Sequence, residues 1–253
     1  MSIFSKLMTS QYYFDGGGYV RDGLTFMLDG IWNVKKHKHN SNVTYIRNLV
    51  DGKKYTPTNF TDYEYSNNAL VIKSNNTSQY TNLFPANITD VKTIELCFDF
   101  STPNVQEIYT FLKIGAIHFA TRITTGSNKH CFFILMPTNS TTEQYEQIGR
   151  YYDVSDGFII GNANTFLIKM DTPYDVNTYT FELGNTNPIA YTGTGEKVNK
   201  SSDNSNFSHI VAKSLPNNID VNIHAIRFYN RFLSDSEITN NCNLDRQRFN
   251  NVN

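Results

Sequence analysis

The feature that most constrains this fold is the alternation of apolar and polar residues over short segments. Between Thr93 and Phe100, four apolar residues (Ile94, Leu96, Phe98, Phe100) fall on one side of an extended chain and three others (Glu95, Cys97, Asp99) on the opposite side. A period of two is typical of a β-strand with one buried face. We therefore expect a half-buried strand over residues 93–100.

Similar short segments recur along the chain and indicate many strands. We expect them at residues 24–29, 69–73, 108–114, 117–123, 131–136, 165–170, 178–183 and 219–229. Turn-forming Gly, Pro and Asn separate them, as at 102–104 and 125–128, and this punctuation predicts a sandwich or barrel. Only 18% of residues are charged, and the polar surface must come from Asn, Thr and Ser. The polar stretch Gly184–Ser208 predicts a long loop.

One helix is expected near the C-terminus, from about Asp235 to Arg246. Ser234 and Glu237 have the spacing of a capping box, and Leu233 and Ile238 have that of a hydrophobic staple. Asp235 places a negative charge in the first turn, where the helix dipole favours it. Ile238 and Cys242 are expected to face inward, with Leu244 at the edge.

Charge and cysteine content exclude several classes of protein. The net charge of −1 argues against a basic protein that wraps nucleic acid. The one basic run, Lys35–His39, is interpreted as a solvated loop, with contact to a phosphate or an acidic polymer as the alternative. Cys97, Cys131 and Cys242 form no Cys-x-x-Cys pair, so neither a zinc site nor a disulfide framework is expected.

Residues 1–22 are expected to be a lead-in or attachment segment, and residues 23–253 a single domain. The glycine run Gly16–Gly18 predicts a flexible joint between them. The start of the chain has no apolar stretch of signal-peptide length, and no segment reaches the length of a membrane span. We therefore expect synthesis in the cytoplasm without membrane insertion.

The segment Ile223–Ile238, which reads IHAIRFYNRFLSDSEI, resembles the closing motif of laminin-G-like, concanavalin-A-like lectin domains. The ending Asn243–Phe249, the opening Gly23–Gly30, the segment Tyr45–Gly52 and the strand Thr93–Leu96 are similar to other parts of that family in the same order. The resemblance implies an all-β jelly-roll sandwich of two antiparallel sheets with one short C-terminal helix. It also implies a binding module of the kind found on bacterial and phage surface proteins. The usual Y-V-N-G hairpin before the last strand is not visible.

Catalytic signatures are weak in this sequence. Hydrolases of a related fold use an E-x-D-x-x-E motif, which is absent, although Glu95 and Asp99 share one face of a strand. No Gly-x-Ser-x-Gly or His-Glu-x-x-His motif occurs. His118 and His224 are interpreted as core or edge residues, and Arg227, Tyr229 and Arg231 as determinants of the fold. We expect no enzymatic activity, with a glycoside hydrolase as an alternative.

Glycan binding needs an exposed aromatic ring with polar donors beside it. The candidates are the aromatic residues of polar segments, namely Trp32, Tyr63, Tyr65, Tyr151 and Tyr152, and core packing or a protein interface is the alternative for each. Because many laminin-G-like domains hold calcium, the resemblance leaves a calcium ion open, with Asp153, Asp156 and Asp171 on expected loops.

These observations predict a non-catalytic, carbohydrate-binding structural protein of a phage virion. It would recognise a host-surface glycan or cell-surface polysaccharide, contact other virion proteins and bind no nucleic acid, and a homo-oligomer is possible. The alternative is a purely structural virion component that holds neighbouring subunits without sugar affinity.

Overall fold

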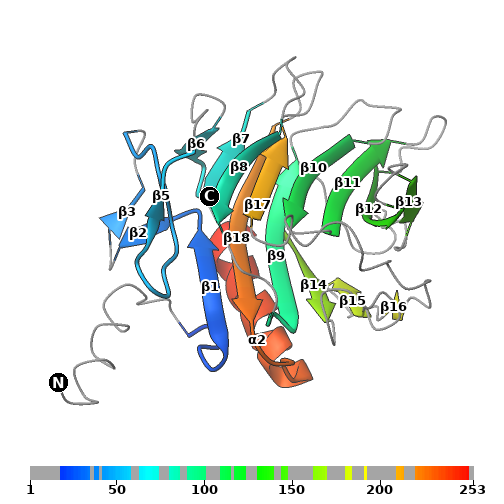
Figure 1. Cartoon of the computed structure of the whole chain (residues 1–253). Helices are drawn as coiled ribbons and strands as arrows, with labels where there is room; N and C mark the ends of the chain where they lie inside the picture. Colours follow the sequence, from blue (N-terminus) through cyan, green and yellow to red (C-terminus); the bar gives the residue numbers. More distant parts are fainter. Residues whose placement is uncertain are drawn as a thin grey trace.

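Two antiparallel strands, β9 (Thr93–Phe100) and β18 (Val221–Tyr229), form the centre of the fold. The computed structural model describes residues 18–34, 37–39, 42–57, 63–73, 80–85, 90–100, 109–114, 117–123, 130–139, 144–147, 162–169, 180–183, 191–192, 209–213 and 220–250. Figure 1 shows both strands near the middle of the molecule, with helix α2 (Asp235–Asp245) behind them.

The larger sheet has eight strands, β9 and β18 included. Its path runs β16 (Tyr191–Thr192), β15 (Thr180–Leu183), β14 (Asn164–Lys169), β9, β18, β7 (Ala69–Ile72) and β6 (Tyr63–Ser66), with β1 (Leu24–Asp29) also paired to β18. β7 pairs with the first residues of β18 and β1 with the last, so β1 and β7 lie end to end along one edge.

A six-stranded antiparallel sheet forms the other layer. Its order is β13 (Gln144–Gln147), β12 (His130–Asn139), β11 (Ile117–Ile123), β10 (Tyr109–Ile114), β17 (His209–Lys213) and β8 (Tyr80–Pro85). Two small hairpins lie beside β1, namely β2 (Trp32–Val34) with β3 (His37–Lys38) and β4 (Ile46–Arg47) with β5 (Lys54–Tyr55).

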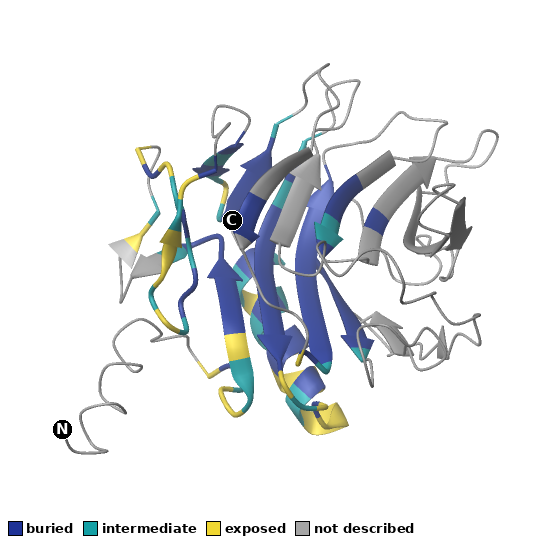
Figure 2. Cartoon of the chain, viewed as in Figure 1, coloured by how far each residue is buried: buried dark blue, intermediate teal, exposed yellow. Residues whose placement is uncertain are grey.

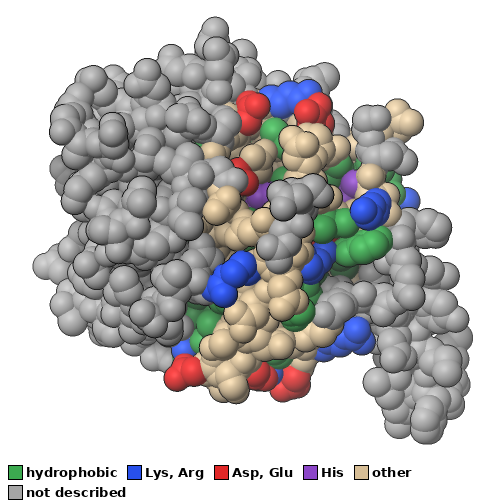
Figure 3. All heavy atoms as spheres, turned by 180° about the vertical axis from the view of Figure 1, so that it is seen from behind, with side chains coloured by type: hydrophobic (Ala, Val, Ile, Leu, Met, Phe, Trp, Pro, Cys, Tyr) green, Lys and Arg blue, Asp and Glu red, His purple; other side chains and the backbone are tan. Residues whose placement is uncertain are grey.

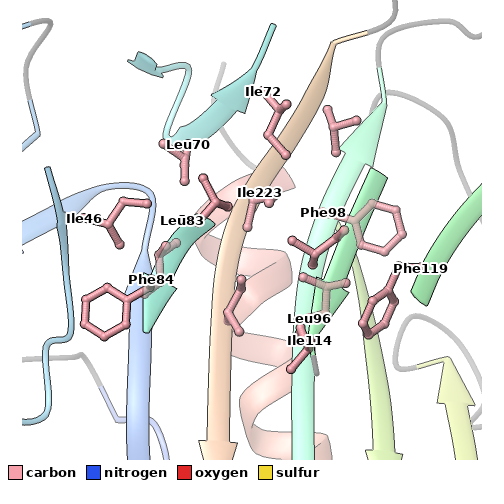
Figure 4. Packing of buried hydrophobic residues seen from close by; sticks show 14 of the residues in the cluster. Ile46, Leu70, Ile72, Leu83, Phe84, Leu96, Phe98, Ile114, Phe119 and Ile223 are labelled. Atoms are coloured by element: carbon pink, nitrogen blue, oxygen red, sulfur yellow. The ribbon is translucent and has the colours of Figure 1, made fainter. Parts of the chain in front are cut away.

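The main core fills the space between the two sheets (Figure 4). Phe98 on β9 packs against Phe111 on β10 and Phe166 on β14, each with ring centroids 5.1 Å apart. Burying one such side chain contributes about 1.5–3 kcal/mol. The inward side of β9 carries the four apolar residues that alternation predicted, and all four belong to this core. The architecture is a concanavalin-A-like sandwich of antiparallel sheets with one C-terminal helix, which confirms the expected fold class.

The prediction that β9 is only half-buried is wrong, because all eight of its residues are buried (Figure 2). The outer face of the strand is covered by α2 and by the π-helical turn Arg246–Asn250 that follows it. The covered residues include Glu95, Cys97 and Asp99, which explains how polar side chains come to be buried on a sheet face that would otherwise meet solvent.

Helix α2 begins where the sequence predicts. Ser234 is its N-cap, and the capping box with Glu237 is formed. Leu233 and Ile238 belong to one small apolar cluster with Cys242, so the inward face is also as predicted. Within the described residues, no helix is long and apolar enough to cross a membrane.

The expected lead-in is described only in its last part, since residues 1–17 lie outside the described residues. Tyr19 is buried, and its hydroxyl donates to Asp245 Oδ1 at 2.6 Å. Asn240 on α2 donates through its side chain to the carbonyl of Gly18 at 3.0 Å. Residues 18–22 therefore pack on the domain. The predicted loop Gly184–Ser208 contains β16, and its other residues lie outside the described ones.

Candidate functional site

A buried polar cluster joins α2 to the outer face of the larger sheet. Arg227 on β18 donates through Nε to Glu95 Oε2 at 2.6 Å and through Nη1 to Asp245 Oδ1 at 2.9 Å. Asn241 donates to Glu95 Oε2 and to the hydroxyl of Tyr229, both at 3.0 Å. Burial raises the pKa of Glu95, and the charge of Arg227 opposes that rise. The cluster attaches α2 to strands β9 and β18, which confirms the structural role predicted for Arg227 and Tyr229.

His224 lies in a β-bulge of β18. Ile223 pairs with Phe98 and Ala225 with Cys97, which leaves His224 as the extra residue between them. Bulges turn a side chain out of the regular alternation. The ring of His224 consequently reaches Asp99 Oδ2 through Nε2 at 3.0 Å and the carbonyl of Asn68 through Nδ1 at 3.1 Å.

This histidine and its neighbours are closely packed. His224 is 4% exposed and Asp99 is 7% exposed, Phe249 lies against the imidazole ring, and Asn222 donates to Asp99. Among the described residues, no hydroxyl or thiol hydrogen-bonds to His224. The ring links β9, β18 and the turn between β6 and β7, as expected for an edge histidine. Asp99 and Glu95 point to different partners and form no carboxylate pair.

Trp32 lies at the start of the β2–β3 hairpin and is half-buried. Its ring packs beside two small apolar clusters, one containing Ile31 and Phe249, the other Met27 and Leu49. The main-chain N–H groups of Ile31 and Trp32 donate to Asp29 Oδ1 at 2.9 and 3.0 Å, which fixes the turn that presents the indole.

Each hairpin combines an aromatic ring with a cation. Trp32 pairs with Lys38 across β2–β3, and Lys38 Nζ lies 6.0 Å from the indole centroid. Arg47 pairs with Lys54 across β4–β5, and both lie near the ring of Tyr45, at 5.5 Å for Arg47 Cζ and 4.4 Å for Lys54 Nζ. Such distances are those of cation–π contacts. We call these five residues the hairpin surface.

The two hairpins belong to one region of the molecule. Leu49 and Val50, which follow β4, share an apolar cluster with Trp32. Figure 3 shows hydrophobic and basic side chains next to one another on the right of the view, where these hairpins lie, and acidic side chains at the top and bottom.

His39 and Tyr65 form a layer beneath this surface. Their rings stack with centroids 3.5 Å apart, and His39 Nε2 lies 3.0 Å from the carbonyl oxygen of Asp29. Burial lowers the pKa of His39 to about 4, so the imidazole is neutral at pH 7 and Nε2 donates to that carbonyl. Within the described part of the chain, His39 Nδ1 and Tyr65 Oη have no hydrogen-bond partner.

The structure places the predicted glycan contacts in different environments. Tyr63 and Tyr65 on β6 are buried in the main core, so their rings offer no open face to a sugar, and the core alternative applies to both. Trp32 is only half-buried. Tyr151 and Tyr152 lie outside the described residues, as do the calcium candidates Asp153, Asp156 and Asp171. The residues that are described include no group of three acidic, histidine or cysteine side chains fit to hold a metal ion.

Sequence reasoning did not select Lys38, Tyr45 or Lys54 as site residues. In the sequence, Tyr45 stands out only in the segment Tyr45–Gly52 that is similar to the lectin-like family. Lys38 stands out only as part of the basic run Lys35–His39. Their association depends on the register of two short hairpins, and four of the nine residues in those strands are basic or histidine rather than apolar. The hydrophobic pattern therefore gives no sign of the pairing.

Comparison with solved structures supports the fold assignment. The Trypanosoma rangeli sialidase in complex with sialic acid aligns with a TM-score of 0.57 and 12% identity, over 94% of this chain and 35% of that one. A second structure of Trypanosoma rangeli sialidase aligns with a TM-score of 0.56 and 12% identity, over 92% of this chain and 34% of that one. A crystal structure of a receptor binding domain aligns with a TM-score of 0.54 and 11% identity, over 88% of this chain and 51% of that one.

The chain thus spans about a third of the sialidase and about half of the receptor binding domain. No family model matches this sequence, and no curated protein matches it closely enough to count as a relative. At these identities the likeness establishes the shared fold alone.

Proposed function

We propose that this protein is a non-catalytic glycan-binding module that uses the hairpin surface. The observation that carries the proposal is the half-buried Trp32, held by a fixed turn with Lys38 across the hairpin. Sugars stack their C–H faces on aromatic rings, and adjacent N–H donors bind their hydroxyl groups. The proposal is supported by the structural likeness to a sialidase described in complex with sialic acid and to a receptor binding domain.

A glycan array with the purified full chain tests this function, with and without a calcium chelator. Specific binding that falls at least tenfold in Trp32→Ala is the expected result. Phe232→Ala is the matched control, because Phe232 is an aromatic residue that is 46% exposed. It follows the C-terminal end of β18, whereas Trp32 follows Asp29, which pairs with Ala225 nearer the N-terminal end of that strand. Equal loss in both variants, or no binding to any glycan, would overturn the proposal. Loss of binding with the chelator would add a calcium ion to the site.

A non-catalytic role is part of the proposal. Glu95 and Asp99, the two carboxylates of β9, are both engaged with buried cationic or imidazole partners, which leaves neither as a free acid or base. Turnover of soluble polysaccharides, including sialosides, by the purified chain would instead favour the glycoside hydrolase alternative.

We also propose that the module is displayed on a phage virion, where it meets host-surface glycan. The support for this location is the sequence resemblance to surface proteins. Mass spectrometry of purified particles tests it, and absence of the protein from them would remove the proposal. A blank glycan array together with presence in the particle would favour the purely structural role between virion subunits.

A further inference from the structure

We propose that the hairpin surface recognises an acidic polysaccharide, through its carboxylate, sulfate or phosphate groups, rather than a neutral one. This inference rests on the proposed glycan-binding function and specifies its ligand. The argument depends on how charge is distributed along the chain and on what the cations of the two hairpins contact.

Positive charge is concentrated in the hairpin segment. Of the 22 lysines and arginines in the chain, six lie between residues 30 and 57, and of the 23 acidic residues only Asp51 does. The segment therefore carries a net charge of +5, and the other residues together carry −6. An overall charge of −1 conceals this separation, which is why composition alone gives no indication of an anionic ligand.

Two lysines of this surface, Lys38 and Lys54, are available to a ligand. Lys38 and Lys54 are exposed, and neither forms an ion pair with a carboxylate in the described part of the chain. Within the described part of the chain, these two lysines contact the ring faces of Trp32 and Tyr45. Lys53, by contrast, is paired with Asp51 at 3.3 Å. An ammonium group that lies over a ring keeps its charge and its donors for a third partner.

The spacing of ring and cation fits a charged sugar. A pyranose that takes the place of the lysine over the indole or phenol would leave the ammonium group beside the stacked sugar, within reach of its acidic substituent. Two such units, one on each hairpin, favour a polymer with repeated negative charges over a single charged sugar, because linked contacts add avidity.

A nucleic acid is the less suitable polyanion. Its binding depends on extended positive surface that neutralises many phosphates. An acidic polysaccharide can meet the protein through a few residues only.

The test compares the full-length protein with Lys38→Gln/Lys54→Gln and with the control Lys53→Gln/Lys73→Gln. The control removes the same charge from two exposed or half-exposed lysines that are already ion-paired to Asp51 and Glu64. The probes are heparin for sulfate, polygalacturonate for carboxylate, polyphosphate for phosphate, dextran as a neutral polymer and a single-stranded DNA oligonucleotide. Binding is measured at about 50 mM and about 300 mM sodium chloride, since screening shortens the reach of charge between these values.

We expect at least one acidic polysaccharide to bind more tightly than dextran and to weaken with salt. Lys38→Gln/Lys54→Gln should lower that affinity by about tenfold and reduce its salt dependence, while the control changes it by less than about threefold. The probe that binds best identifies the anionic group. A neutral glycan that binds through Trp32 with no effect of either lysine pair would overturn this inference and leave the proposed function standing. Absence of binding to any sugar would overturn both, and tighter binding of the oligonucleotide would replace the polysaccharide with nucleic acid.

Discussion

Arg227 on β18 and Asp245 at the end of α2 form a bidentate ion pair inside the protein. Nη1 of the arginine donates to Oδ1 at 2.9 Å, and Nη2 donates to Oδ2. The same carboxylate accepts from the hydroxyls of Tyr19 at 2.6 Å and Thr165 at 2.8 Å. The helix is thus attached to the sheet by a carboxylate whose charge is neutralised by Arg227 and which also accepts hydrogen bonds from two hydroxyls.

Replacing Arg227 by methionine tests this attachment. The change leaves Glu95 and Asp245 buried without their cation, and breaking a buried pair in this way costs about 3–5 kcal/mol. Unfolding in urea, followed by circular dichroism, measures the loss. Arg246→Met is the control, since Arg246 lies near the end of the same helix and is only partly buried. If Arg227→Met does not fold, Asp245→Asn gives a milder version of the same test. Equal stability of Arg227→Met and Arg246→Met would contradict the structure.

Two buried tyrosines should respond in opposite ways to loss of their hydroxyl groups. Tyr19 Oη donates to Asp245 and accepts from Arg248 Nη1 at 3.0 Å, whereas Tyr65 Oη has no partner among the described residues. Tyr19→Phe should destabilise the protein by about 1–3 kcal/mol, because charged groups lose hydrogen bonds. Tyr65→Phe should be neutral or stabilising, because it removes a buried polar atom without breaking a bond. The midpoints of urea unfolding compare the stabilities of the two variants. A larger loss of stability in Tyr65→Phe than in Tyr19→Phe would contradict these hydrogen-bond partners.

Gly30 lies where β1 and β7 meet end to end. A Cβ atom at this position would be 2.5 Å from both the Cα of Ala69 and the carbonyl oxygen of Asn68. Those atoms are backbone and cannot rotate away, so Gly30→Ala should cost about 1–3 kcal/mol. Thr239→Ala, on the exposed side of α2, should change the unfolding free energy by less than about 0.5 kcal/mol. Thermal unfolding of both variants measures the difference. Equal melting temperatures would contradict the close approach of Gly30 to the backbone of Asn68 and Ala69.

The sequence predicted the elements that have strong local signals. Residues 93–100 and 117–123 are strands with the expected bounds, and the capping box predicts where α2 begins. The pattern of β6, YEYS, is too short to predict a strand by alternation alone. The two residues that follow it, Asn67 and Asn68, adopt positive φ (51° and 59°), as in a tight hairpin turn. The burial of both faces of β9 depends on a helix more than a hundred residues away, which no local pattern reveals.

The candidate site was predicted only in part. Trp32 was selected because it is aromatic in a polar segment, and it lies on the hairpin surface. The same criterion selected Tyr63 and Tyr65, which alternate inward from β6 into the core. Composition cannot separate these cases, because exposure of an aromatic ring depends on which face of a strand another layer covers.

Glu237 should make the stability of the protein depend on pH in the acidic range. Hydrogen bonds from Arg231, foremost, and from the N-cap Ser234 lower its pKa from 4.5 to about 2. Because the pKa of the folded state is depressed, the carboxylate contributes stability that is fully present above pH 4.5 and is lost as the pH falls towards 2.

Glu237→Gln isolates this contribution, because glutamine can still complete a capping box but carries no charge. Since the ion pair with Arg231 is partly exposed and screened by solvent, we expect the variant to be about 1 kcal/mol less stable at neutral pH. The difference between the two proteins should shrink steadily between about pH 4.5 and about pH 3. Asp235→Asn, which removes an exposed charge from the same helical turn, separates this effect from that of the helix dipole. A difference between Glu237→Gln and the unmodified protein that stays constant from pH 7 to pH 3 in urea unfolding would show that the Arg231–Glu237 pair does not act through its charge.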